Sequence, residues 1–337
     1  MENYNTEVTR YSKTVGKKKK TDDFVASDSS FVKWTDRLKE SLEKGEELTF
    51  DPKLIRRCLY RPFTPRFVYF DDLLVHRRYL QTEFFPHAKA EKDNIAISLT
   101  DIGGRSHFSA LAVKGLTELH LCATVDTFQC FPLYTYSEDG KERRDNIPRS
   151  TLDRFAIHYD DDTITRADIF HYVYAVLHHP EYRARYAENL KRELPRLPFA
   201  PGFHAFAKAG AKLAELHVHY ERQKEWKLQR IEDKDTPLDW RVEAMKLTRE
   251  RDALIYNEHF TFAGIPPAAH EYRLGNRSAL DWVIDQYRVT RDAEGRIASD
   301  PNRDDDEPFI ARLVAQVVTV SVETMKLVRA LPTLGLP

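Results

Sequence analysis

Residues 60–70 read YRPFTPRFVYF, and they lie where the hydrophobic pattern of the chain changes. Before them, residues 31–44 (FVKWTDRLKESLEK) repeat apolar side chains at helical spacing and end before Gly45, a typical helix stop. After them, short segments rich in β-branched and aromatic residues alternate with turn signals. From about residue 163 the helical spacing returns. This separation of helices and strands predicts an α+β fold, with a β-rich middle segment and a helical C-terminal half.

The middle of the chain is predicted to hold short strands. Residues 52–60 (PKLIRRCLY) are predicted to form a short helix instead, because Pro52 suits the first turn of a helix. Residues 13–30 and 137–149 are polar and are predicted to be loops. The predicted strands are 66–70, 94–101, 107–115, 117–124 and 130–136.

The C-terminal half is predicted to be mainly helical. Thr165 and Asp168 resemble a capping box, with Asp in place of the usual Glu or Gln, so a helix is expected to begin there. Residues 317–324 (VVTVSVET) fit either a helix or a strand. The predicted helices cover 165–178, 180–194, 203–227, 238–251, 278–287 and 308–330, and residues 254–265 are predicted to be extended.

Composition limits the possible classes of protein. The 337 residues carry a net charge of -1, which excludes a uniformly basic coat but allows a local basic patch. The three cysteines form no CxxC pair, and such sparse cysteines suit a reducing compartment. The N-terminus has no apolar segment typical of a secretory signal, and no run of 18 apolar residues predicts a membrane span. We therefore expect a cytoplasmic protein without a membrane partner.

Motifs for catalysis and for metal binding are missing from the sequence. There is no phosphate-binding GxxxxGK[ST] loop, no GxGxxG and no GxSxG. The signature that amino-methyltransferases use for a flipped base, Asn or Asp followed by two prolines and an aromatic residue, is also missing. His217 and His219 would face different sides of a helix, so they are not interpreted as zinc ligands. The chain is predicted to have no catalytic residue, metal or cofactor of its own.

A basic and aromatic segment surrounds the opening stretch. Residues 52–92 hold nine basic and four acidic side chains, a local net charge of +5 in a nearly neutral chain. Arginine suits contacts with phosphates and with guanine edges, and aromatic rings can stack on bases. The alternative is that the aromatic rings form the core and that Asp71 and Asp72 hold the arginines. The candidate binding residues are Arg56, Arg57, Arg61, Arg66, Arg77, Arg78, Arg105, His107, Lys141, Arg143 and Arg144.

Several strings of this sequence resemble the C-terminal region of type ISP restriction–modification enzymes. They lie between about residues 50 and 330, and the string at 168–199 is the longest. These enzymes are single polypeptides with a nuclease, a helicase-like ATPase, a coupler, an adenine methyltransferase and a final target-recognition domain. The strings are YRPFTPRFVYFDD, FPLYTY, DIFHYVYAVLHHPEYRARYAENLKRELPRLPF, AGAKLAELHVHYE, GNRSALDWVIDQYRV and VTVSVETMKLV.

The resemblance implies a division of the chain and a function for it. Residues 1–50 would be a linker and helical lead-in after the methyltransferase, 51–150 a β-rich recognition subdomain, and 151–337 a mainly helical subdomain of the same domain. The chain would recognise a sequence in double-stranded DNA. The methyltransferase and helicase–nuclease domains would be its partners, and S-adenosylmethionine, ATP and Mg would bind only to them. The alternative is a non-enzymatic module that docks on such a partner without touching DNA.

Overall fold

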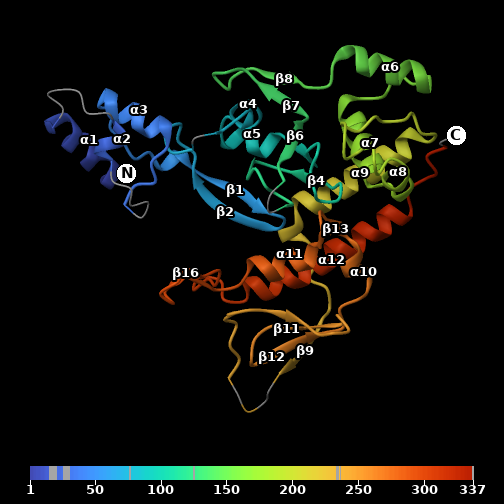
Figure 1. Ribbon diagram of the computed structural model, residues 1–337. Helices are drawn as coiled ribbons and strands as arrows, with labels where there is room; N and C mark the ends of the chain where they lie inside the picture. Colours follow the sequence, from blue (N-terminus) through green and yellow to red (C-terminus); the bar gives the residue numbers. More distant parts are fainter. Residues whose placement is uncertain are drawn as a thin grey trace. The chain divides into compact units, whose positions relative to one another are not determined.

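The computed structural model describes residues 1–14, 21–25, 31–75, 77–123, 126–232, 235 and 237–335 (Figure 1). It is an α+β fold with a mainly helical C-terminal half, as predicted. The chain divides into two compact units: unit 1 is Met1–Cys58 with Arg66–Thr82, and unit 2 is Leu59–Pro65 with Glu83–Pro337. This division by contacts differs from the predicted functional boundaries at residues 50 and 150, which stay a prediction.

Unit 1 is built on helices α1 (Glu2–Thr14), α2 (Thr21–Phe24) and α3 (Asp36–Lys44). Helix α3 begins after Thr35, whose side chain accepts a hydrogen bond from the backbone N–H of Leu38 at 3.2 Å, and it ends at Gly45 as predicted. The predicted start at residue 31 was therefore too early. Helix α1 was not predicted, and the predicted loop 13–30 is partly wrong, because Lys13 and Thr14 end α1 and residues 21–24 form α2. Residues 15–20 and 26–30 of that loop lie outside the described residues.

Residues 55–61 form a strand, so the helix predicted over residues 52–60 is wrong. Pro52 begins only a 3₁₀ turn (Pro52–Leu54), and β1 (Ile55–Arg61) follows it. Strand β1 lies between β2 (Thr64–Tyr69) and β5 (Leu116–Thr117) in a three-stranded sheet. Its backbone groups therefore find partners on both sides, which outweighs the helical preference of its leucine and arginines. Phe63 makes the turn between β1 and β2 with a positive φ of 57°.

Unit 2 contains a buried antiparallel sheet in the order β4-β3-β6. Its strands are β3 (Ala96–Thr100), β4 (Ala110–Val113) and β6 (Phe128–Pro132). Strands β3 and β4 lie within predicted strands, whereas β6 begins two residues before the predicted strand 130–136. Every residue of β3 and β4 is buried. The predicted strand 117–124 is mostly wrong, because Thr117 alone of its described residues belongs to a strand, β5, and the backbone N–H of Ala123 bonds to the carbonyl of His120 in a turn. Thr124 lies outside the described residues. The predicted loop 137–149 is partly wrong, because it contains β8 (Arg143–Asp145), which pairs with β7 (Tyr134–Tyr136), and the first residue of a helix.

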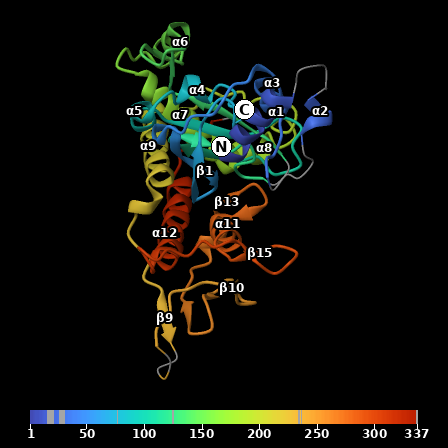
Figure 2. The same cartoon turned by 90° about the vertical axis from the view of Figure 1, so that its left-hand side faces the viewer.

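Helices α7 (Arg166–His178) and α9 (Phe203–Val218) of unit 2 pack against each other. The capping box of Thr165 and Asp168 is present as predicted. A methyl group on Gly210 of α9 would lie 1.8 Å from the carbonyl oxygen of His171, so the two helices approach closely at this glycine. Residues 317–324 belong to α12 (Phe309–Arg329), which settles their open assignment as helical; α9 and α12 lie side by side (Figure 2).

Three further predictions for the helical half were partly or wholly wrong. Residues 238–251 are not a helix, because Lys246–Leu247 form β10 of a sheet in the order β10-β11-β12-β9, whose other strands are β11 (Ala253–Ile255), β12 (Phe260–Ala263) and β9 (Gln229–Glu232). The helices predicted over 180–194 and 203–227 end earlier, at Arg185 and Val218. The extended segment 254–265 is confirmed by β11 and β12, and Ser278 caps a helix as expected.

The remaining elements are short. They are α4 (Gln81–Phe84), α5 (Ala88–Asp93), α6 (Arg149–Tyr159), α8 (Pro180–Arg185), α10 (Ala268–Glu271), α11 (Ala279–Gln286), a 3₁₀ turn (Tyr220–Arg222), β9 (Gln229–Glu232), β11 (Ala253–Ile255), β12 (Phe260–Ala263), β13 (Arg273–Leu274), β14 (Arg277–Ser278), β15 (Thr290–Arg291) and β16 (Ile297–Ser299). Within the described ranges, no helix is both long enough and apolar enough to cross a membrane.

Candidate functional site

The candidate binding residues belong to different units. Since the sequence grouped most of them into one basic segment, each is described here within its own unit. Unit 1 holds Arg56, Arg57, Arg66, Arg77 and Arg78, and unit 2 holds Arg61, Arg105, His107, Lys141, Arg143 and Arg144.

In unit 1, two of the arginines pack against the same aromatic ring. The guanidinium carbon of Arg56 lies 5.1 Å from the ring centroid of Phe70, and that of Arg78 lies 5.6 Å from it. Arg56 is 9% exposed, so its charge faces the protein and not the solvent. Arg78 forms an ion pair with Asp72, and Arg37 pairs with the same carboxylate. Two cations therefore share the carboxylate of Asp72.

Arg77 differs from its neighbours in unit 1 because it is exposed and, among the described residues, has no hydrogen-bond or ion-pair partner. Arg57 is exposed and Arg66 is half-buried, and both interact with other groups. Of these three side chains, Arg77 presents its guanidinium to the solvent with no internal bond to break. An arginine in this state can bind a phosphate at low cost.

Arg61 is held inside unit 2 by an ion pair. Its Nη1 donates to Oε2 of Glu118 at 2.5 Å and to the carbonyl of Tyr60 at 2.7 Å, and its guanidinium lies 4.2 Å from the ring centroid of Tyr60. The backbone N–H of His120 donates to the same Glu118 oxygen at 2.7 Å. Arg61 therefore fastens the end of β1 to the turn that follows β5.

Loop 101–107, which carries Arg105 and His107, is fixed by two carboxylates. Asp101 accepts hydrogen bonds from the side chains of Thr127 at 2.6 Å and Gln129 at 2.5 Å. Burial opposes the ionisation of Asp101, but these bonds outweigh it and lower its pKa. Asp126 accepts from the backbone N–H of Ser106 at 2.7 Å, and its pKa is lowered as well, against the effect of burial.

Two glycines hold positions in this loop where a larger residue would be strained or crowded. Gly103 has a φ of 78° and donates its N–H to the carbonyl of Lys191 at 2.8 Å. A methyl group on Gly104 would lie 3.3 Å from both the carbonyl oxygen of Asp101 and the carboxyl carbon of Asp126. Arg105 and His107 are both exposed on this rigid loop. Their presentation to solvent is thus built into the fold of unit 2.

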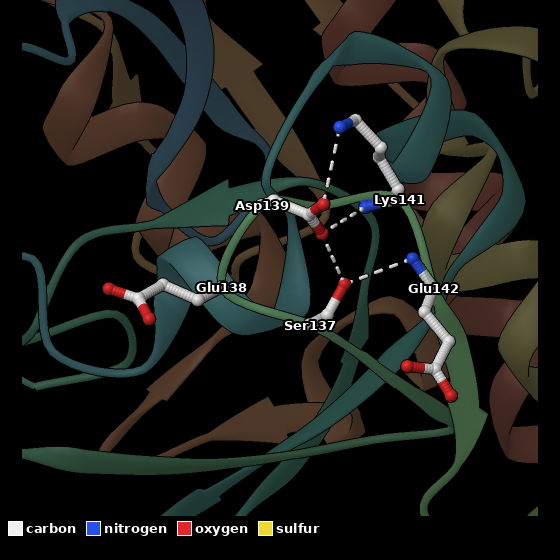
Figure 3. A pocket seen from close by; sticks show the side chains of 5 residues that line it. All are labelled: Ser137, Glu138, Asp139, Lys141 and Glu142. Atoms are coloured by element: carbon white, nitrogen blue, oxygen red, sulfur yellow. Dashed lines mark hydrogen bonds and ion pairs between the residues drawn. The ribbon is translucent and has the colours of Figure 1, made fainter.

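Lys141 lies in a shallow hollow of about 510 Å³ at the tip of the β7–β8 hairpin (Figure 3). Its Nζ is 3.3 Å from the carboxylate of Asp139, which also accepts from Ser137 at 2.6 Å; the hydrogen bonds from Ser137 and from the Lys141 backbone lower the pKa of Asp139. Glu138 and Glu142 also line the hollow. Three carboxylates against one ammonium group make this hollow a poor phosphate site.

The two arginines of β8 have different surroundings. Arg144 donates to Glu142 at 2.6 Å, so its charge is matched locally. The guanidinium of Arg143 lies 4.3 Å from the ring centroid of Tyr134, and Arg143 pairs with no carboxylate among the described residues. Of the three candidate residues on this hairpin, Arg143 could bind an anion without giving up an ion pair to any described carboxylate.

Sequence reasoning missed one residue beside the predicted site. Asn276, in the turn between β13 and β14, accepts a hydrogen bond from the ring Nδ1 of His107 at 2.7 Å, although 169 positions separate the two. Such a contact leaves no local pattern in the sequence. As for metals, the described part of the chain holds no cluster of three or more His, Cys, Asp or Glu that could bind an ion.

Comparison with known proteins gives a consistent result. Residues 1–309 match the family described as the Type ISP C-terminal specificity domain. No curated protein sequence matched. The fold is similar to that in a structure of a nuclease-deletion mutant of the Type ISP restriction–modification enzyme LlaGI in complex with a DNA substrate mimic, with 32% identity, a TM-score of 0.84, and coverage of 100% of this chain and 30% of that one.

Two further solved structures are similar over nearly the whole chain. One is a DrdV–DNA complex, with 32% identity, a TM-score of 0.83, and coverage of 98% of this chain and 33% of that one. The other is the ATP-dependent Type ISP restriction–modification enzyme LlaBIII bound to DNA, with 28% identity, a TM-score of 0.84, and coverage of 100% and 22%. This chain therefore spans a third or less of the length of the proteins that it resembles.

Proposed function

We propose that this chain, which belongs to the family of Type ISP C-terminal specificity domains, binds double-stranded DNA and recognises a specific sequence in it. The observation that carries the proposal is the similarity of fold, over 98–100% of the chain, to parts of proteins whose structures contain DNA. The family match and the absence of a recognisable catalytic motif both support a role in recognition, with chemistry carried out elsewhere.

The basic side chains divide into two roles under this proposal. Arg77, Arg105 and Arg143 are exposed, and within the described part of the chain no hydrogen bond or ion pair with a carboxylate holds their guanidinium groups. They would contact phosphates or base edges, as arginine does in DNA complexes. Arg61 and Arg78 already have carboxylate partners and would support the fold. Moving them onto DNA would leave Glu118 and Asp72 without these cations.

The wider activity requires domains beyond this chain. In the proposed role, the chain directs adenine methylation and ATP-dependent cleavage that a methyltransferase and a helicase–nuclease carry out. S-adenosylmethionine, ATP and Mg would bind to those domains. The chain would act in the cytoplasm, where DNA and these cofactors are available.

The test is a fluorescence-anisotropy titration of this chain with a pool of random duplex DNA at two salt concentrations. If the chain contacts several phosphates, the logarithm of the binding constant should fall linearly with the logarithm of salt concentration, by about 0.9 per phosphate. Selection from the pool should then enrich one sequence. Binding without any enriched sequence would contradict the recognition role. If the chain binds no DNA, either alone or with the methyltransferase added, it would instead be a docking module that does not touch DNA.

A further inference from the structure

The side-chain amide of Asn276, in the β13–β14 turn, makes two hydrogen bonds to His107 in loop 101–107. The side-chain oxygen of Asn276 accepts from the backbone N–H of His107 at 3.2 Å and from its ring Nδ1 at 2.7 Å. Both residues are exposed. This double contact joins two segments of unit 2 that are far apart in the sequence, and it fixes the side chains relative to each other.

The hydrogen bonds determine which polar atoms remain available. A backbone N–H can only donate, so the Asn276 atom that faces it is the oxygen. Nδ1 of His107 faces the same oxygen and must therefore carry the ring proton, which leaves Nε2 of the neutral ring as an acceptor. The Asn276 amide keeps its two N–H donors. Neither Nε2 nor this NH₂ group has a partner among the described residues, so one acceptor atom and one donor group with two N–H bonds are offered to solvent.

The turn that presents Asn276 cannot easily move. Gly275 is buried with a φ of 62°, and a methyl group there would lie 2.5 Å from the carbonyl oxygen of Cys122. Arg273 donates to the backbone carbonyl of Asn276 across the turn. On the other side, Asp101 and Asp126 hold the loop of His107. The donor and acceptor are therefore pre-organised, which lowers the entropy cost of binding a ligand.

The charges around the pair include two exposed arginines and two carboxylates. Arg105 is exposed on loop 101–107, and Arg273 is exposed in β13 beside the turn of Asn276. Neither has an ion-pair partner at contact distance among the described residues. The nearby carboxylates of Asp101 and Asp126 accept bonds from the loop itself and from neighbouring side chains. Glu271, before the turn, pairs with Arg329.

We propose that His107 and Asn276 form a base-reading pair, with the His107 Nε2 accepting from an exocyclic amino group of adenine or cytosine while the Asn276 amide donates to an adjacent acceptor. This inference rests on the proposed DNA recognition and deepens it. Each base pair offers such groups in the major groove. The common two-donor contact to guanine N7 and O6 is excluded for this pair, because His107 offers an acceptor. Arg105 would hold the neighbouring backbone.

The decisive variant is Asn276→Asp. It keeps an oxygen for both bonds from His107 and replaces the outward-facing NH₂ group by a second acceptor that carries a negative charge. In a selection from random duplexes, followed by titration of the enriched sequence, the affinity of Asn276→Asp for the wild-type site should fall at least about fivefold, and the preference at one base pair should change. The matched control is Gln229→Glu, the same amide-to-carboxylate change on exposed strand β9, which should keep the base preference.

His107→Ala provides a second test if Asn276→Asp does not fold. Loop 101–107 has its own anchors in Asp101 and Asp126, so this variant is expected to keep the melting temperature within a few degrees and to lose the preference for an amino group at the same base pair. Unchanged base preference in both variants would overturn the base-reading pair while leaving the proposed function standing. If the unsubstituted chain selects no sequence at all, both proposals fall.

Discussion

The guanidinium of Arg61 lies 2.5 Å from the carboxylate of Glu118, 57 positions further along the chain. Both side chains are mostly removed from solvent, with 12% and 29% of their surface exposed. The pair joins the end of β1 to the turn after β5, and the ring of Tyr60 covers its cation. Arg61, which the sequence suggested as a DNA contact, is thus held by an internal ion pair with Glu118.

This relationship predicts a loss of stability for Arg61→Ala. The substitution leaves Glu118 without its cation in a partly buried position, so the free energy of unfolding should fall by about 2 kcal/mol. Urea unfolding followed by circular dichroism measures it. DNA affinity of the folded variant should stay within about twofold of the unsubstituted chain; a much larger loss of affinity with unchanged stability would instead identify Arg61 as a contact residue.

Arg77 and Arg105 are expected to behave in the opposite way. Arg77→Gln and Arg105→Gln should each leave the melting temperature unchanged, because neither side chain forms an ion pair at contact distance with any residue that the structure describes. Each should reduce the slope of log affinity against log salt by about 1 if the arginine binds a phosphate. Lys326→Gln is the matched control, since Lys326 pairs with Glu323 on α12. Slopes equal to that of the control would remove Arg77 and Arg105 from the interface.

The contact between α7 and α9 predicts a penalty for enlarging Gly210. In Gly210→Ala the new methyl group would overlap the carbonyl oxygen of His171, so the helices must separate. Overpacking of this kind costs about 1–3 kcal/mol, more than the helix preference of alanine returns. Thermal unfolding of this variant should be compared with that of Lys208→Ala, a substitution at an exposed position of the same helix. An equal or higher melting temperature for Gly210→Ala would contradict the close approach.

A buried histidine predicts that the fold weakens in mild acid. His217 is 2% exposed; its Nδ1 lies 2.5 Å from the Tyr174 hydroxyl and its Nε2 lies 2.9 Å from that of Thr324. Burial, with a smaller contribution from the charge of Arg183, lowers the pKa of His217 to about 3, and burial also lowers that of the neighbouring His178.

The direction of this pH effect follows from proton uptake. The unfolded chain protonates His217 near its usual pKa of 6.5, whereas the folded chain does not until about 3, so stability is lost as the pH falls below 6.5. Each such proton gives a slope of about 1.4 kcal/mol per pH unit. Unfolding free energies measured between pH 6.5 and 5 should show a smaller slope for His217→Gln than for the unsubstituted chain, with exposed His158→Gln as the control. Equal slopes would contradict the prediction.

The sequence predicted well those helices and strands that are specified by capping residues or hydrophobic patterns within the segment itself. The capping box at Thr165 and the helix start at Ser278 are as expected, and Ser278 also forms a capping box, whose bonds span only three residues. The strands β3, β4 and β6 follow from runs of apolar and β-branched residues. In contrast, residues 55–61 and 238–251 have helix-forming compositions, yet strand pairing or irregular contacts with distant segments override this preference.

The α+β class and the family resemblance were readable from the order of residues, because each rests on strings and periods that neighbouring residues carry. The roles of the basic side chains were not. Arg61 meets Glu118, Arg78 shares Asp72 with Arg37, and Asn276 meets His107 only because the folded chain brings them together. A charge can bind a ligand only if no internal partner already holds it, and that partner is chosen by proximity in space and not by distance along the sequence.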